Sequence, residues 1–216
     1  MINRVAFLNK FLLSPGKIGS ITPSSKYLTQ KMLSAVPWAQ IETLVELGAG
    51  TGVFTRYIAD HKTASCQVLV IERDFHMRKL LRNTYPMFHF GAKAENLDRL
   101  LHQHALSPAD CIISGLPFAT FPDLLRHKLI ATSYRVLKPE GIFIAFQYSL
   151  QMRKTLKTYF PQVGINFVPL NIPPAFVYFC KKTVSLATVE PRWHRTTQPT
   201  YVVYIRIKQG GYSQHY

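Results

Sequence analysis

The stretch Val45-Glu46-Leu47-Gly48-Ala49-Gly50-Thr51-Gly52 decides the fold of this chain. It starts in an apolar run that is typical of a buried strand, and it ends in three glycines that alternate with other residues. Glycine at such a turn lets the backbone reverse sharply and lets a ligand approach the main chain closely. The spacing is GxGxG, which differs from the GxGxxG of dinucleotide-binding proteins. We therefore predict a strand, a ligand-binding turn and a helix in this order, and a purely structural turn is the alternative.

Strand and helix patterns alternate along the chain around this turn. Apolar runs that predict strands lie at Thr43–Leu47, Gln67–Glu72, Phe88–Gly91, Asp110–Ser114 and Gly141–Tyr148. Helical patterns lie between them at Val53–His61, at Asp74–Thr84 with Asp74 as the cap, at Asn96–His104 and at Pro122–Leu137. Such an alternation predicts an α/β fold with a parallel sheet and helices on both faces.

The pattern changes after residue 150. A helix is expected near Met152–Tyr159, and two strands follow at Val163–Asn171 and Ala175–Lys181. The segment Ile172-Pro173-Pro174 between them predicts a hairpin.

The two ends of the chain have their own patterns. Residues 2–13 predict a short amphipathic helix, residues 14–23 a loop, and Thr22-Pro23 the start of a helix that runs to about Ala35. Tyr201–Lys208 is a further strand candidate. We expect an N-terminal covering segment over 1–40, a core over 41–182 and a basic extension over 183–216.

The charge of the chain is strongly basic and unevenly distributed. There are 26 Lys and Arg residues against 11 Asp and Glu, which gives a net charge of +15 and a pI near 9.9. Residues 1–40 carry +5, residues 41–150 only +2, and residues 151–216 carry +8. Such a balance indicates an acidic partner, either nucleic acid or an anionic membrane surface.

Cysteine use and hydropathy exclude several classes of protein. The three cysteines are scattered, and no Cys or His spacing predicts a metal site. We expect a reduced, cytoplasmic compartment and no metal. No apolar run reaches the roughly 18 residues that a transmembrane helix needs, and the N-terminus does not predict a signal peptide.

Glu72 ends the strand that follows the glycine turn, twenty residues after Gly52. A carboxylate in this place can accept hydrogen bonds from both hydroxyls of a ribose. The residue therefore strengthens the interpretation of the turn as a ligand site.

The segment Glu46–Gly52 resembles motif I of class I S-adenosylmethionine-dependent methyltransferases, and the resemblance extends over residues 43–182. It implies a Rossmann-like, seven-stranded, mostly parallel sheet in the order 3-2-1-4-5-7-6, with Ala175–Lys181 antiparallel. It also implies S-adenosylmethionine as the cofactor. The cofactor-binding residues that follow from the resemblance are Glu46, Gly48, Ala49, Gly50, Thr51, Gly52, Glu72, Arg73, Ala94, Glu95, Ser114 and Leu116.

One stretch departs from the family pattern. Lys93 stands where an aspartate normally meets the adenine amino group, and lysine cannot accept that hydrogen bond. Either Glu95 or a backbone carbonyl would take this role, or the register differs by a residue or two.

The segment Ser114-Gly115-Leu116-Pro117-Phe118 resembles the Asn-Pro-Pro-Tyr-type motif of N-methyltransferases. The motif binds the target nitrogen, and its aromatic residue covers the target, which assigns Pro117 and Phe118 to the substrate. Ser114 replaces the usual asparagine, which argues against methylation of a nucleic-acid base.

Together with Ser14–Ser25 and Asn171–Tyr178, this motif resembles the bacterial phospholipid N-methyltransferases, which are similar to ribosomal RNA adenine dimethylases. The implied reaction is methylation of the amine of phosphatidylethanolamine by a cytoplasmic enzyme that associates peripherally with the membrane. The amphipathic helix at residues 2–13 would lie on anionic lipid. The candidates for catalysis are Ser114, Tyr148 and Tyr27, and those for substrate binding are Pro117, Phe118, Asn171 and Tyr178.

Two alternatives remain open at this point. An RNA adenine N6-methyltransferase explains the charge of +15 directly, although Ser114 and the short C-terminal extension argue against it. A binding protein without turnover on a methyltransferase scaffold is supported only by Lys93.

Overall fold

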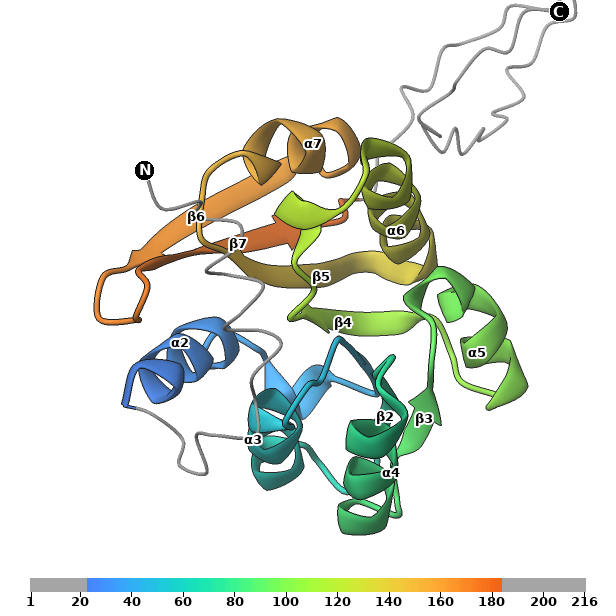
Figure 1. Cartoon of the computed structure of the whole chain (residues 1–216). Coiled ribbons are helices and arrows are strands. Elements are labelled where there is room, and N and C mark those ends of the chain that lie inside the picture. The colour runs from blue at the N-terminus through green and yellow to red at the C-terminus, as the bar shows by residue number, and fades with distance from the viewer. Residues whose placement is uncertain (1–22, 184–216) are drawn as a thin grey trace, which may run out of the picture.

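A seven-stranded sheet in the order β3-β2-β1-β4-β5-β7-β6 forms the centre of the computed structural model, which describes residues 23–183 (Figure 1). The order confirms the one expected. Strands β1 to β5 are parallel to one another, and β7 runs antiparallel to both β5 and β6. The strands are β1 Thr43–Leu47, β2 Gln67–Ile71, β3 His89–Gly91, β4 Ala109–Ser114, β5 Leu137–Gln147, β6 Gln162–Val168 and β7 Ala175–Lys181.

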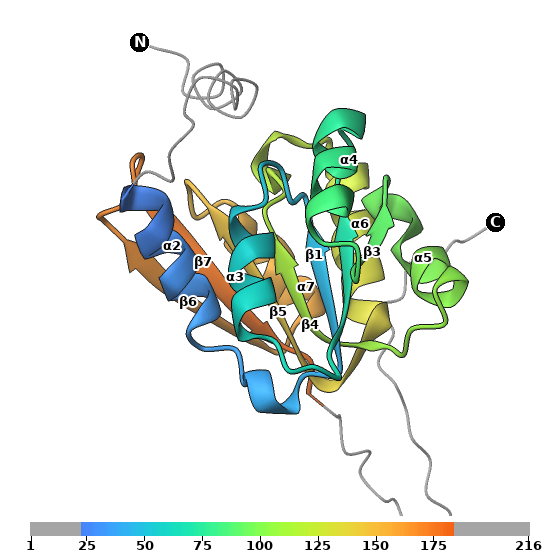
Figure 2. The same cartoon turned by 90° about the horizontal axis from the view of Figure 1, so that it is seen from below.

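Six α-helices cover the two faces of the sheet in the described part of the chain. They are α2 Pro23–Leu33, α3 Val53–His61, α4 Phe75–Thr84, α5 Leu97–Gln103, α6 Asp123–Val136 and α7 Met152–Tyr159. Figure 2 shows α2, α3 and α4 in front of the sheet and α6 and α7 behind it. The expectations for the helix at residues 2–13, the loop at 14–22 and the strand at Tyr201–Lys208 lie outside the described residues.

The central strands are buried on both faces, which explains why they are continuous apolar runs. All five residues of β1 are buried, and alternate side chains enter opposite layers of the core. Leu44 packs with the layer that contains Ile58 of α3, and Val45 packs with the layer that contains Leu101 of α5. The period of two along each strand therefore builds two separate cores, one for each set of helices.

Several boundaries differ from the expected ones. Strand β5 begins at Leu137, not Gly141, because Leu137 takes an extended conformation and pairs with Ala109 across an irregularity in the register. Helix α6 consequently ends at Val136. Strand β6 ends at Val168, and Pro169, which has no N–H group for the ladder, follows it.

The amino ends of the central strands are tied together by Asp110. One carboxylate oxygen accepts hydrogen bonds from the N–H groups of Glu42 (2.9 Å) and Thr43 (2.8 Å), and the other forms an ion pair with Lys138 at 2.8 Å. Strands β1, β4 and β5 are thus fixed relative to one another at this edge. The opposite, carboxyl edge carries the glycine turn, as parallel α/β sheets generally place their ligands.

Candidate active site

The glycine turn joins β1 to α3, and all three of its glycines have left-handed backbone conformations. The φ angles of Gly48, Gly50 and Gly52 are 73°, 56° and 83°. The N–H groups of Gly48 and Ala49 donate to the carbonyl of Ile71 (2.8 and 3.3 Å), which holds the turn over the end of β2. A Cβ atom on Gly50 would meet nothing within 4 Å. Gly50 therefore faces open space, on the side from which a ligand can approach the backbone.

Glu46, the fourth residue of β1, brings a buried carboxyl group to this turn. It is fully buried, and its Oε2 accepts a hydrogen bond from the Thr55 hydroxyl at 2.7 Å. Its Oε1 has no hydrogen-bond partner among the described residues. The pKa of Glu46 is raised to about 8, mainly by burial; the charge of Glu72 adds to this shift, and the bond from Thr55 opposes it. A buried oxygen without a partner fits a ligand that brings a hydrogen-bond donor or a cationic group.

Glu72 lies directly against the turn. Its Oε2 accepts a hydrogen bond from the Gly50 N–H at 2.6 Å, and its Oε1 accepts one from the Asp74 N–H at 2.7 Å. The carboxylate is almost buried and links β2, the glycine turn and the start of α4. Glu72 thus contacts the glycine turn through Gly50, and Arg73 follows it on the surface.

The segment after β3 forms a short 3-10 helix, Ala94–Asn96. Ala94 is buried and Glu95 half-buried, whereas the side chain of Lys93 is exposed. Leu97 is buried in the core and fixes the segment. Glu95 rather than Lys93 is thus the partly enclosed polar side chain after β3.

The loop after β4 is in direct backbone contact with the glycine turn. The N–H of Gly115 donates to the carbonyl of Leu47 at 2.8 Å. A Cβ atom on Gly115 would lie 2.7 Å from the Gly48 carbonyl oxygen, and one on Gly48 would lie 2.9 Å from Leu116 Cδ2. Gly115 was not among the residues predicted from the sequence, although its position directly after β4, the neighbour of β1, is the signal that could have identified it.

Ser114 ends β4, between Leu47 of β1 and Ala145 of β5. It is fully buried, and its hydroxyl accepts a hydrogen bond from the Leu116 N–H at 3.3 Å. The side chain therefore shapes the turn that leads to Leu116 and Pro117, which are both half-buried.

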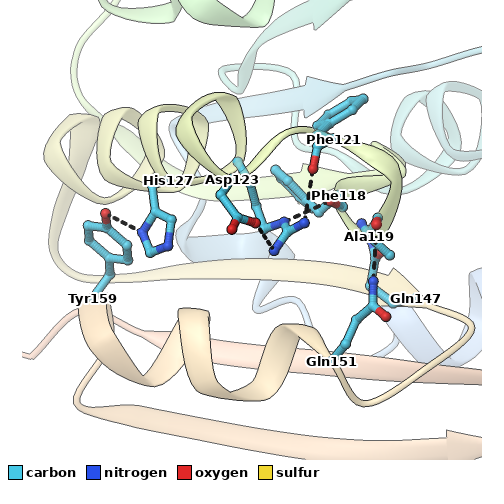
Figure 3. Close-up of polar contacts among 9 residues, drawn as sticks. Phe118, Ala119, Phe121, Asp123, His127, Gln147, Gln151 and Tyr159 are labelled. Atoms are coloured by element: carbon cyan, nitrogen blue, oxygen red, sulfur yellow. Dashed lines mark hydrogen bonds and ion pairs between the residues drawn. The ribbon is translucent and has the colours of Figure 1, made fainter.

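Gln147 holds this loop from the end of β5 (Figure 3). Its Nε2 donates to the Leu116 carbonyl at 2.9 Å, and its Oε1 accepts from the Ala119 N–H at 3.2 Å. Gln151 adds a bond from its Nε2 to the Ala119 carbonyl at 3.1 Å. The buried amide of Gln147 thus brackets Pro117 and Phe118, and we name Leu116–Ala119 the acceptor loop. A glutamine at the end of an otherwise apolar strand is the only signal that the sequence offers for this role.

Arg126 of α6 fixes the other side of the acceptor loop. Its guanidinium donates to the carbonyls of Phe118 (3.0 Å) and Phe121 (2.9 Å) and forms an ion pair with Asp123 at 2.9 Å. Figure 3 shows Asp123, the ion-pair partner of Arg126, beside the bond between His127 and Tyr159, which links α6 to α7. The loop is therefore held by side chains from the end of β5, from the turn before α7 and from α6.

Two residues assigned to the substrate lie inside the core. Phe118 is 1% exposed, and its ring packs against Phe121 and Phe143. Tyr178 of β7 is fully buried, and its hydroxyl donates to the carbonyl of Ser149 at 3.0 Å. In this structure neither ring is open to a substrate, because the β4–α6 loop and β7 direct these side chains into the layer that α6 and α7 cover.

Tyr148 and Asn171 are brought together at the carboxyl edge. Asn171 is buried. Its side chain donates to the Pro173 carbonyl at 2.7 Å and lies close enough to the Tyr148 hydroxyl to act on the pKa of that group. The Tyr148 ring packs against Phe146, which in turn packs against Phe54 next to the glycine turn. Burial raises the pKa of Tyr148. A continuous row of rings thus links the β6–β7 hairpin to the glycine turn.

Tyr27 lies apart from this group. It is exposed on α2 and lines a groove with Phe167 and Leu170 of the hairpin, and neither Ser114 nor Tyr148 lines that groove. Within residues 23–183, no group of three or more His, Cys, Asp or Glu side chains is arranged to hold a metal ion. No helix in the same range is long and apolar enough to span a bilayer.

The fold and the glycine turn define the class of protein, and comparisons with known proteins agree. Residues 44–141 match the family model described as a methyltransferase domain. The N-methyltransferase NodS from Bradyrhizobium japonicum, solved with S-adenosyl-L-homocysteine, superposes with a TM-score of 0.61 at 12% identity, over 82% of this chain and 97% of NodS.

Two curated proteins are similar in sequence. An ornithine lipid N-methyltransferase from Singulisphaera acidiphila is 35% identical over 180 residues, which are 81% of this chain and 94% of that protein. A protein-L-isoaspartate O-methyltransferase from Roseiflexus sp. is 30% identical over 156 residues, which are 69% of this chain and 67% of that protein. The chain belongs to the class I S-adenosylmethionine-dependent methyltransferases, and S-adenosylmethionine is its cofactor.

Proposed function

We propose that this enzyme transfers the methyl group of S-adenosylmethionine to the amine nitrogen of a membrane lipid, with phosphatidylethanolamine as the head group. The observation that carries the proposal is the similarity to an ornithine lipid N-methyltransferase over 94% of the length of that protein. A lipid amine also agrees with Ser114 in place of the asparagine that base methyltransferases use.

We propose that the cofactor is held at the glycine turn by the two glutamates. The partnerless Oε1 of Glu46 would accept from its ammonium group, and Glu72 would accept from the ribose while keeping its bond to Gly50. When bound, S-adenosylmethionine supplies a methyl group that its positive sulfur activates. The other residues proposed to border the cofactor are Gly48, Ala49, Thr51, Gly52, Arg73, Ala94, Glu95, Ser114 and Leu116.

The acceptor amine must be neutral to react, because its lone pair forms the new N–C bond as the S–C bond breaks and the electron pair goes to sulfur. We propose that its proton leaves to water. Burial raises the pKa of Tyr148, so this hydroxyl stays protonated at neutral pH and is not the base. In the proposed site, Tyr148 instead offers its hydroxyl and its ring face to the nitrogen, whose positive charge grows during the reaction.

Methyl transfer from labelled S-adenosylmethionine tests the substrate. The acceptors are vesicles that contain phosphatidylethanolamine, vesicles that contain ornithine lipid, and unmodified ribosomal RNA. We expect label in phosphatidylethanolamine. Label in ornithine lipid alone would show that the substrate is a membrane lipid other than phosphatidylethanolamine. Label in RNA alone would overturn the proposal.

A Gly50→Arg variant is the control for the cofactor site. Its side chain would enter the open space beside the turn, and its backbone would be strained at a φ of 56°. We expect loss of cofactor binding and of all label, with the far-UV circular dichroism of the folded enzyme retained.

A further inference from the structure

The β6–β7 hairpin projects from the edge of the sheet that carries the proposed active site. Phe176 of β7 pairs with Gln147, the last residue of β5, and β7 begins one residue earlier at Ala175. The hairpin tip, residues 169–174, therefore starts where the parallel strands end. Tyr148 directly follows Gln147, so the tip lies beside the proposed substrate position.

Large apolar side chains are exposed on and around this tip. Leu170 is 61% exposed and Ile172 is 74% exposed, and Phe167 lies just before them on β6 with 53% exposure. Leu150 in the β5–α7 turn and Tyr27 on α2 are also exposed. Clustered apolar exposure of this kind marks a surface that is covered by a partner in use.

Two shallow grooves flank the hairpin, and Phe167 lines both of them. One groove lies on the α7 side and includes Leu150 and Arg153. The other lies on the α2 side and includes Tyr27 and Lys31. Each groove therefore combines an apolar lining with one cationic side chain.

The charges around the hairpin have no acidic counterparts. No Asp or Glu occurs in residues 23–41 or 141–183, whereas all ten acids of the described chain lie between Glu42 and Glu140. Five exposed cations near the hairpin form no ion pair with any described residue: Lys26 and Lys31 on α2, and Arg153, Lys154 and Lys157 on α7. We name these cations, together with Tyr27, Leu150, Phe167, Leu170 and Ile172, the hairpin face.

We propose that the hairpin face is the surface with which the enzyme rests on an anionic bilayer. Its apolar side chains would enter the interface between head groups and acyl chains, and its cations would lie against lipid phosphates. This orientation presents the mouth of the proposed active site to the lipid head groups. The inference rests on the proposed lipid substrate. The unpaired cations and exposed apolar side chains of the hairpin face favour a bilayer over a second protein chain as its partner.

Co-sedimentation of the full chain with vesicles, with and without anionic phosphatidylglycerol, tests the proposal. We expect wild-type enzyme to bind the anionic vesicles. Leu170→Ser with Ile172→Ser should weaken this binding about tenfold or more, because two exposed apolar anchors are lost. Lys31→Gln with Arg153→Gln should weaken it by about fivefold for each charge removed, and should reduce its salt dependence.

Matched variants on the other side of the molecule are the controls. Leu80→Ser with Met87→Ser removes two apolar side chains of similar exposure, 66% and 65%, on α4 and in the turn after it. Lys79→Gln with Arg99→Gln removes two exposed cations on α4 and α5. Neither control should change vesicle binding, and thermal melts should show that all four variants fold.

The test of membrane binding by the hairpin face can be separated from the test of the proposed substrate. Methyl transfer to phosphatidylethanolamine in neutral detergent micelles reports the proposed function without a bilayer, and we expect it to be retained in every variant. Vesicle binding that neither hairpin variant weakens would overturn the inference, even if transfer in micelles proceeds. No transfer to any lipid, with vesicle binding that both hairpin variants weaken, would overturn the function and keep the inference. If Leu170→Ser with Ile172→Ser abolished a dimer and left vesicle binding unchanged, the hairpin face would be a contact between two copies of the chain, and the membrane inference would be overturned.

Discussion

Glu46 is the residue whose ionisation the fold changes most clearly within the site. Its pKa is raised from 4.5 to about 8, mainly by burial, so the folded enzyme keeps it neutral at pH 7. Because the folded pKa lies above the unfolded one, this residue contributes stability that is fully present below about pH 4.5 and is lost as the pH rises through about 8. A cationic ligand would reverse the preference and favour the carboxylate.

Cofactor affinity should therefore rise with pH. Between pH 6 and pH 7.5 we expect the affinity for S-adenosylhomocysteine to increase by up to about tenfold per pH unit, because binding would release the Glu46 proton. Calorimetry in two buffers with different ionisation enthalpies would measure that proton. A Glu46→Gln variant should bind more weakly and with a flat pH profile. An unchanged profile in this variant would exclude Glu46 as the titrating group.

Gly115 is a second residue on which the site depends. A Gly115→Ala variant places a Cβ atom 2.7 Å from the Gly48 carbonyl oxygen, so the two loops must separate. We expect cofactor affinity to fall by about tenfold or more, in line with overpacking costs of about 1–3 kcal/mol. Gly164→Ala in β6 is the matched control, since its nearest contact is an ordinary 3.7 Å. If calorimetry gave the same cofactor affinity for Gly115→Ala and Gly164→Ala, the close approach of the two loops at Gly115 would not matter for cofactor binding.

At the scale of elements, side chains from neighbouring elements determine the conformation of the acceptor loop. Its carbonyls and N–H groups bond Gln147, Gln151 and Arg126, which come from β5, the turn before α7, and α6. A loop that is fixed in this way before substrate binding reduces the ordering that catalysis requires.

A Gln147→Glu variant tests this arrangement. The carboxylate can still accept from the Ala119 N–H but cannot donate to the Leu116 carbonyl, so the loop should shift. We expect kcat/KM to fall by about 10–100-fold, as small misplacements of reacting groups do, with cofactor affinity nearly unchanged. Gln151→Ala, which removes one exposed bond, should cost far less. Steady-state kinetics with parallel calorimetry would separate the two effects, and a loss of cofactor affinity equal to the loss of kcat/KM would contradict a positioning role.

The amino edge of the sheet should matter for stability alone. Asp110→Ala removes the acceptor of two backbone N–H groups and the partner of Lys138. We expect the free energy of unfolding to fall by about 2 kcal/mol, because two backbone N–H groups lose their acceptor and an ion pair with Lys138 is lost, and Tm to fall by about 4–8 °C. Asp98→Ala breaks an exposed ion pair with Arg135 and an exposed bond from the Arg99 N–H, and should change little. Calorimetric melts would measure both, and cofactor affinity should stay constant in both.

The sequence predicted elements well where the pattern was local. Thr43–Leu47, Val53–His61, Met152–Tyr159 and Ala175–Lys181 have the expected bounds, because apolar period and flanking turn residues determine them. The start of β5 was wrong, since the pairing of Leu137 with Ala109 depends on a distant strand.

The candidate site divides in the same way. The glycine turn and Glu72 could be predicted because a short motif encodes them. Gln147 and Arg126 could not, since their partners are backbone atoms of a loop that is remote in sequence. The burial of Phe118 and Tyr178 likewise depends on the packing of α6 and α7 over the sheet.

At the scale of the whole molecule, the net positive charge lies mostly outside the part of the sequence that forms the proposed active site. The net charge is +15, yet residues 41–150, which hold the glycine turn and the acceptor loop, contribute only +2. The cofactor-binding part is nearly neutral, and the excess of positive charge lies in the sequence segments on either side of it.

Salt should therefore affect binding to the membrane and leave the chemistry unchanged. At ionic strengths above about 0.1 M, where the screening length falls below about 10 Å, we expect methyl transfer on anionic vesicles to decline steeply. Transfer in neutral micelles should change little over the same range. Equal salt sensitivity in both assays would place the relevant charges inside the active site.

The bond between Glu72 and the Gly50 N–H has a consequence for control of the enzyme in the cell. It fixes the glycine turn in shape during folding, so little ordering remains for the cofactor to impose. Glu46 and Glu72, proposed to hold the ammonium group and the ribose of the cofactor, would not distinguish S-adenosylmethionine from S-adenosylhomocysteine, because both molecules carry these groups. The spent cofactor should therefore compete effectively for the same place. The rate of methylation in the cell would then follow the ratio of S-adenosylmethionine to S-adenosylhomocysteine rather than the concentration of either alone.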